Sequence, residues 1–114
     1  MRITSFEEII AWQKSKTLTL LLYKLFANNR DYAFKDQIQR ASVSIMNNIA
    51  EGFERHTNAE LRNFLYIAKG SSGEVRSLLY LAFELKYLHE SDFRTLRDMA
   101  LEVSRLLSAF IKKI

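Results

Sequence analysis

The chain has 114 residues, of which 48% are hydrophobic and 26% are charged, and its formal net charge is +4. This length and composition predict one globular domain over residues 1–114 with a single apolar core, and they exclude an intrinsically disordered chain. Because cysteine is absent, disulfides, thiolate zinc sites and cysteine nucleophiles are excluded, which fits a protein of the reducing cytoplasm.

No segment is typical of secretion or of membrane insertion. The N-terminal residues lack the apolar region of a signal peptide, and the longest apolar run, Leu78–Phe83, is far shorter than the ~20 residues of a membrane span. We therefore expect a cytoplasmic protein that does not bind membranes. The 17 basic and 13 acidic residues favour anionic partners such as nucleic acid, although many small bacterial domains carry such an excess without one.

Helical periodicity runs through almost the whole chain, which has no proline and only three glycines. The first helix is predicted to begin at Ser5, where Ser5 and Glu8 have the spacing of a capping box, and to end near Phe26. Residues 28–30 break the pattern. The second helix is predicted to begin with Asp31 as its N-cap and to run to about Glu54.

The third helix is predicted to begin at a second capping box, formed by Thr57 and Glu60. Its apolar stripe comprises Leu61, Phe64, Leu65, Ala68, Ser71, Ser72, Val75, Leu78, Leu79, Ala82 and Leu85. Ser91 is the predicted cap of the fourth helix, whose stripe runs from Phe93 to Ile114. Four long helices with short joints predict an all-α, antiparallel up-down-up-down four-helix bundle.

Polar side chains interrupt the apolar seam of the second helix. Asn48 falls at a core position of the 3-4 spacing, with Ser44 one turn before it and Glu51 one turn after it. Such a trio could form a catalytic or ligand-binding site, or it could be a hydrogen-bonded polar lock between helices. We favour the polar lock, because no histidine or lysine lies nearby in the sequence to activate Ser44.

The opposite face of the second helix is apolar as well. Val43, Met46 and Ala50 lie about 180° around the helix from Ala41 and Ile45. A helix that is apolar on two sides is expected to be buried on two sides. In a four-helix bundle, the second apolar side of this helix is expected to pack against another copy of the chain. We therefore predict a homo-oligomer with contacts through Val43, Met46 and Ala50.

Basic residues recur every seven positions at Arg55, Arg62, Lys69 and Arg76. If the third helix is continuous, the last three share one face beside the apolar stripe. The predicted role of this stripe is phosphate contact with nucleic acid, and the alternative is a solvated basic face.

A second line at heptad spacing holds Tyr66, Tyr80 and Tyr87, with Gly73 between the first two. These rings could stack on bases. We favour the alternative, in which they pack at a joint between subunits.

Nothing in the sequence predicts an enzyme, a cofactor or a metal site. His56 and His89 flank the third helix, too far apart to share a metal ion within one chain. The motifs of di-iron bundles, zinc proteases and phosphate-binding loops are absent. Gly70 and Gly73 lie inside a helical pattern, where the close approach of another helix explains them better than phosphate binding.

The run from Gln37 to Arg55, QIQRASVSIMNNIAEGFER, resembles the signature of four-helix bundle proteins related to the 23S rRNA intervening-sequence proteins, also called S23 ribosomal proteins. Accessory proteins of diversity-generating retroelements are similar to it as well. Ala11–Lys14, Ala68–Glu74 and Tyr87–Leu88 resemble further elements of the family. The resemblance covers residues 5–88, and the fourth helix matches only in pattern. Met46 stands where members usually have proline, which should smooth the second helix.

This resemblance implies a ring-shaped homo-oligomer, a homopentamer of bundles, with no enzymatic activity. It also implies nucleic-acid binding and, for the retroelement relatives, binding to a reverse transcriptase. Our hypothesis is a non-enzymatic ring that binds structured RNA or DNA through phosphates at Arg55, Arg62, Lys69 and Arg76. The alternative is an adaptor for a reverse transcriptase or another nucleic-acid-processing protein.

Overall fold

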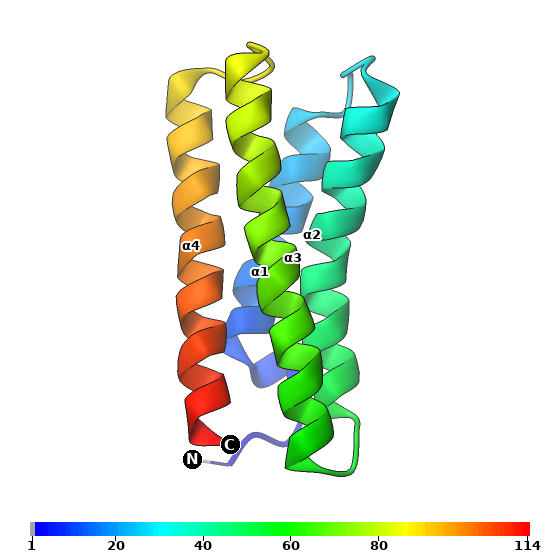
Figure 1. Cartoon of the computed structure of the whole chain (residues 1–114), viewed down its shortest axis with the longest axis vertical. Coiled ribbons are helices and arrows are strands. Elements are labelled where there is room, and N and C mark those ends of the chain that lie inside the picture. The colour runs from blue at the N-terminus through cyan, green and yellow to red at the C-terminus, as the bar shows by residue number, and fades with distance from the viewer. Residues whose placement is uncertain (1) are drawn as a thin grey trace.

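The computed structural model of the chain describes residues 2–114. Its elements, in chain order, are the 3₁₀ turn η1 (Phe6–Glu8) and the helices α1 (Ile10–Leu25), α2 (Tyr32–Phe53), α3 (Asn58–Glu84) and α4 (Glu90–Lys113). The predicted all-α fold with four helices is confirmed. Figure 1 shows the four helices side by side, with the joints between them at alternating ends of an elongated molecule of 43 × 23 × 19 Å.

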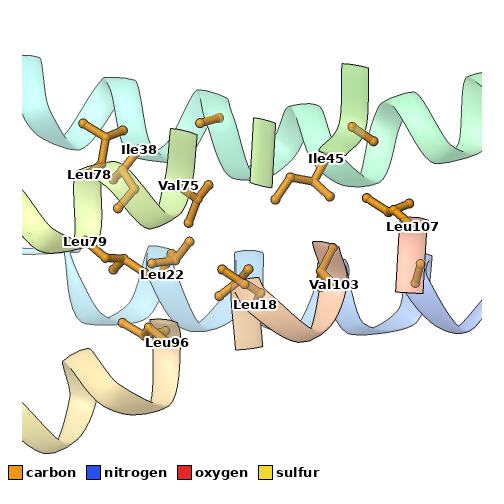
Figure 2. Close-up of a cluster of buried hydrophobic side chains, with 14 of the residues drawn as sticks. Leu18, Leu22, Ile38, Ile45, Val75, Leu78, Leu79, Leu96, Val103 and Leu107 are labelled. Atoms are coloured by element: carbon orange, nitrogen blue, oxygen red, sulfur yellow. The ribbon is translucent and has the colours of Figure 1, made fainter. Parts of the chain in front are cut away.

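The helices form a ring of neighbours around one core. α1 contacts α2 and α4, and α3 contacts the same two helices from the other side. The side chains that fill the centre come from all four helices, as Figure 2 shows for Leu18, Leu22, Ile38, Ile45, Val75, Leu78, Leu79, Leu96, Val103 and Leu107. This arrangement places the α1–α2 side of the bundle opposite the α3–α4 side.

The first helix begins later than the sequence predicted. Ser5 precedes η1 and its hydroxyl caps no backbone N–H; instead it donates to Glu8 Oε2 over 3.3 Å. Thr4 also donates to this carboxylate oxygen, over 2.6 Å. Ile9 is extended, and α1 starts at Ile10. The prediction of a capping box at Ser5 was wrong, because the Glu8 N–H donates to the Ser5 main-chain oxygen, over 3.2 Å, and not to the Ser5 hydroxyl.

The starts of α2 and α3 agree with the sequence. Asp31 caps α2, since its carboxylate accepts from the backbone N–H of Phe34 over 3.2 Å. Thr57 caps α3, since its hydroxyl oxygen accepts from the Glu60 N–H over 3.1 Å. α2 continues without a break through Met46, as expected where proline is absent.

The end of α3 lies earlier than its apolar stripe suggested. Leu85 is the C-cap and is 45% exposed, so its predicted place in the core is wrong. Lys86 has a φ of 63°, in the left-handed region where glycine is usual. The Tyr87 N–H donates to the Ala82 carbonyl over 2.8 Å, which closes the helix end in a Schellman arrangement.

The fourth helix begins two residues before the predicted start. His89, not Ser91, occupies the N-cap position of α4, and its side chain makes no capping hydrogen bond. The acidic residues Glu90 and Asp92 lie in the first turn, where the helix dipole favours negative charge. No helix within residues 2–114 is long and apolar enough to cross a membrane.

Candidate nucleic-acid interface

The basic stripe predicted on the third helix lies on one continuous helix. α3 carries Arg62, Lys69 and Arg76 at heptad spacing, so these residues share one face over about 21 Å of helix length. Lys69 is exposed, and Arg62 and Arg76 are half-buried. Lys69 and Arg76 take part in no ion pair within the described chain.

Contacts of α3 with α4 show which way this stripe faces. The Arg62 guanidinium donates to the main-chain oxygen of Ile114, beyond the last turn of α4. Near the middle of both helices, the Ser72 hydroxyl donates to the Ala100 carbonyl over 2.8 Å and accepts from Ser104 over 3.0 Å. The stripe therefore runs along the edge of α3 that adjoins α4.

Arg55 does not belong to this helical stripe. It lies in the joint between α2 and α3, before Asn58. Its guanidinium pairs with Glu51 at 3.0 Å and with Glu60 at 3.8 Å, and it lies 4.9 Å from the centre of the Phe64 ring. Two carboxylates thus offset the charge of Arg55, although its side chain is exposed.

Further basic residues lie on the neighbouring helix. Arg97 of α4 pairs with Asp98 at 3.2 Å, a contact that raises the pKa of Arg97, and its guanidinium lies 5.4 Å from the centre of the Phe93 ring. Arg105 and Lys112 line a shallow depression of about 310 Å³ on α4, and Ser104, which bonds to α3, lines it too. Sequence reasoning missed these residues, although the seven-residue spacing of Arg105 and Lys112 repeats that of α3.

We define the basic face as six cations on two adjacent helices. They are Arg62, Lys69 and Arg76 of α3 and Arg97, Arg105 and Lys112 of α4. Within residues 2–114, Arg105 and Lys112 form no ion pair. Unpaired cations on adjacent helices produce a local positive field that attracts polyanions.

The tyrosines separate into two groups. Tyr66 and Tyr80 of α3 are 54% and 51% exposed, and Tyr80 meets Phe93 edge to face at a centroid distance of 5.1 Å. Tyr87 lies beyond the end of α3, so the predicted line of three tyrosines is wrong. Its hydroxyl donates to Asp31 Oδ2 over 2.7 Å, and this hydrogen bond raises the pKa of Tyr87.

The polar trio of the second helix is only partly brought together. Asn48 Nδ2 donates to the carbonyl and to the hydroxyl of Ser44, over 2.8 and 3.0 Å. The Ser44 hydroxyl meets that of Ser71 in α3 at 2.9 Å, so a half-buried hydrogen-bonded chain joins α2 to α3. Glu51 does not join this chain; it is exposed and bonds to Arg55.

The predicted oligomer contacts lie on the α1–α2 side. Val43, Met46 and Ala50 are half-buried, and they are not among the described side chains that pack against the core. Leu20 of α1 is 62% exposed. Thr19 donates to the Ser42 carbonyl over 3.2 Å, and Met46 lies one turn after Ser42, so the strip lies on the side of α2 next to α1. We call Leu20, Val43, Met46 and Ala50 the apolar face.

Only one of the three glycines marks a close helix contact. A Cβ added at Gly52 would lie 2.7 Å from Phe64 Cβ, so this glycine lets α2 approach α3. A Cβ added at Gly70 or Gly73 would meet nothing within 4 Å. Close approach within the chain therefore does not explain Gly70 and Gly73, contrary to the sequence interpretation.

The geometry defines a small all-α protein with a basic face on α3 and α4. Residues 2–114 include no group of three or more histidine, cysteine or acidic side chains placed to hold a metal ion. The sequence profile of the 23S rRNA-intervening sequence protein family matches residues 7–109. The chain belongs to this family, and the match includes most of α4, which the resemblance described above did not cover.

A solved structure supports this assignment. The chain is similar to a protein of unknown function from the S23 ribosomal protein family of Bacteroides thetaiotaomicron VPI-5482. The two share 25% sequence identity with a TM-score of 0.85, over 90% of this chain and 96% of that one. No curated protein matches the chain significantly.

Proposed function

We propose that this protein is a non-enzymatic, oligomeric nucleic-acid-binding protein that holds structured RNA or DNA through phosphate contacts at the basic face. The observation that carries the proposal is a set of cations on adjacent edges of α3 and α4 that form no ion pair within residues 2–114, namely Lys69, Arg76, Arg105 and Lys112. Phosphate contacts supply most of the affinity of such proteins and require no deep pocket.

Assembly would strengthen this interaction. We propose that the antiparallel up-down-up-down bundles associate through the apolar face into a ring-shaped homo-oligomer, with the homopentamer implied by the family resemblance as the expected size. The partial exposure of Leu20, Val43 and Met46 supports such a contact. A ring repeats the basic face in every copy, so a modest charge per chain becomes a large local field.

Salt-dependent binding tests the proposal. Wild-type protein should bind a structured RNA hairpin in a mobility-shift assay at ~50 mM salt, with affinity falling steeply as salt rises. The double variant Lys69→Glu/Arg76→Glu should weaken binding at least about tenfold and make the slope of log K against log salt shallower by about two.

A control variant with the same change in net charge separates a local contact from the overall charge. Lys24 and Arg30 are exposed and take part in no ion pair within the described residues. Lys24→Glu/Arg30→Glu should therefore bind more tightly than Lys69→Glu/Arg76→Glu. Absence of binding by the wild-type protein, or equal losses in the two variants, would count against the basic face as the site.

An adaptor for a reverse transcriptase or a similar enzyme is the second candidate. Ile67 and Leu81 on the outer side of α3 are 51% and 47% exposed, which suits a protein partner. A pull-down from cells with and without nuclease distinguishes the candidates. A partner protein retained after nuclease treatment, and lost in Ile67→Glu/Leu81→Glu, would favour the adaptor.

A further inference from the structure

Cations and tyrosines alternate along one edge of α3. The positions are spaced four, three, four, three and four residues apart, and they are Arg62, Tyr66, Lys69, Gly73, Arg76 and Tyr80. Steps of three and four return to the same face of a helix, so these positions form one straight row. The row lies within the unbroken helix Asn58–Glu84. We call it the alternating row.

The tyrosine rings of this row are available for contact. Tyr66 and Tyr80 each keep about half of their surface exposed, 54% and 51%, and so contribute little to the core. Phe93 contacts Tyr80 edge to face at a centroid distance of 5.1 Å, which holds this ring in place. A ring fixed at its edge with much of its surface open to solvent is a platform on which a flat group can stack.

Gly73 leaves a gap between the two rings. A Cβ at this position would meet nothing within 4 Å, so the space above the helix backbone is open. A larger side chain here would stand between Tyr66 and Tyr80. The glycine therefore permits a planar ligand group to approach the helix midway along the row.

We propose that the alternating row binds unpaired nucleotides, whose bases stack on Tyr66 and Tyr80 while their phosphates contact Arg62, Lys69 and Arg76. This inference rests on the proposed nucleic-acid binding and names the part of the nucleic acid that the site takes. Alternating cations and aromatic rings suit single strands, because unpaired bases offer free faces for stacking. In a duplex the bases stack on one another and their faces are not free. A duplex would therefore contact the cations but not the tyrosine rings.

The length of the row sets the size of the probe. Tyr66 and Tyr80 are 14 residues apart, which is about 21 Å along the helix and equals about six stacked nucleotides at 3.4 Å each. A 12-nucleotide oligouridine is unstructured and spans the row completely. An RNA duplex of 12 base pairs provides the paired counterpart.

Fluorescence anisotropy with these two probes at low salt tests the inference. Tyr66→Ala/Tyr80→Ala should weaken oligouridine binding at least about tenfold, since one base stacked on an aromatic ring accounts for roughly 5- to 150-fold. Its duplex binding should change less than twofold and its salt slope should not change. Tyr66→Phe/Tyr80→Phe should bind as wild type, because the ring and not the hydroxyl stacks on the base.

Tyr32→Ala is the matched control, because Tyr32 is 66% exposed at the start of α2, away from the row. Circular dichroism and sedimentation establish that each variant is folded and assembled as wild type. Equal oligouridine affinities for Tyr66→Ala/Tyr80→Ala and Tyr32→Ala would overturn the inference while duplex binding leaves the proposed function intact. No binding of either probe by wild-type protein would overturn both.

Discussion

The three glycines of the chain all lie inside helices, but their surroundings differ. Gly52 faces α3, where Phe64 Cβ would lie 2.7 Å from an added methyl group. Gly70 and Gly73 face open space. Glycine inside a helix is destabilising by about 0.5–1 kcal/mol relative to alanine, so only Gly52 is explained by packing within the chain.

Substitution by alanine should therefore have opposite effects. Gly52→Ala is expected to lower the free energy of unfolding by about 1–3 kcal/mol, because the backbone of α2 must move away from α3. Gly70→Ala is expected to raise it by about 0.5–1 kcal/mol through helix propensity alone. Urea unfolding measures both, and a loss of stability in Gly70→Ala would show that the helix contacts something at this position.

Tyr87 ties the end of α3 to the start of α2 through Asp31. The hydrogen bond to this carboxylate raises the pKa of Tyr87 in the folded state above the value of about 10 in the unfolded chain. Its contribution to stability is therefore fully present below pH ~10 and is lost as pH rises through the folded-state pKa.

Tyr87→Phe should accordingly be less stable than wild type at pH 7, and the difference should narrow above pH ~10. Thermal unfolding at pH 7, 9 and 11 measures this difference. In addition, absorbance titration of the wild-type tyrosines should contain one late-titrating group that Tyr87→Phe lacks. A stability difference that does not change with pH would contradict this account of the bond.

At the scale of the helices, the two predicted capping boxes show what local sequence can and cannot predict. Thr57 caps α3, because its hydroxyl oxygen accepts from the Glu60 N–H while the hydroxyl donates to Glu60 Oε1. Ser5 has the same spacing to Glu8 and also donates to its carboxylate, yet the Glu8 N–H donates to the Ser5 main-chain oxygen and Ile9 is extended. The motif is local, but the packing of Ile9 in the core is not part of it.

Removal of the Thr57 hydroxyl and removal of the Ser5 hydroxyl should therefore have different effects on stability. Thr57→Ala should lower the free energy of unfolding by about 1 kcal/mol, within a range of about 0.5–2, because the Glu60 N–H loses its acceptor. Ser5→Ala should change it by less than about 0.5 kcal/mol, as for an exposed contact. Equal losses in urea unfolding would indicate that Ser5 caps a helix in solution.

The helix count and much of the core could be predicted, because the 3-4 spacing of apolar residues is visible in the sequence alone. Leu85 and Tyr87 could not be placed, because α3 ends where Lys86 adopts the left-handed conformation. The basic stripe of α3 was visible from its heptad spacing. Its extension by Arg97 required knowledge of the α3–α4 contact, in which Phe93 lies against both Arg97 and Tyr80.

At the scale of the whole molecule, the bundle has an apolar side and a basic side. α1 and α2 carry the apolar face, and the contacts between neighbouring helices place the edge of α3 and α4 across the core from it. A bundle with this distribution can associate on one side and bind a polyanion on the other. We therefore expect assembly and nucleic-acid affinity to be coupled through the number of basic faces per particle.

Val43→Glu/Met46→Glu should separate the particles while the helices remain folded, because a charge in an apolar contact is costly. We expect a lower mass by light scattering, unchanged circular dichroism, and at least about tenfold weaker binding to long RNA through lost avidity. Gln37→Glu, at an exposed position of α2, is the control and should leave the mass unchanged. A monomeric wild-type protein would rule out the coupling.

The order in which the helices pack also bears on how fast the chain folds. Each helix packs against the next one in sequence, and among the described helices only the α1–α4 contact joins distant parts of the chain. Local contacts of this kind favour refolding in microseconds to milliseconds. Because the sequence contains no proline, stopped-flow refolding should also lack the phase of about 10–100 s that prolyl isomerisation causes. A chain that emerges from the ribosome could therefore complete its bundle before it meets another copy.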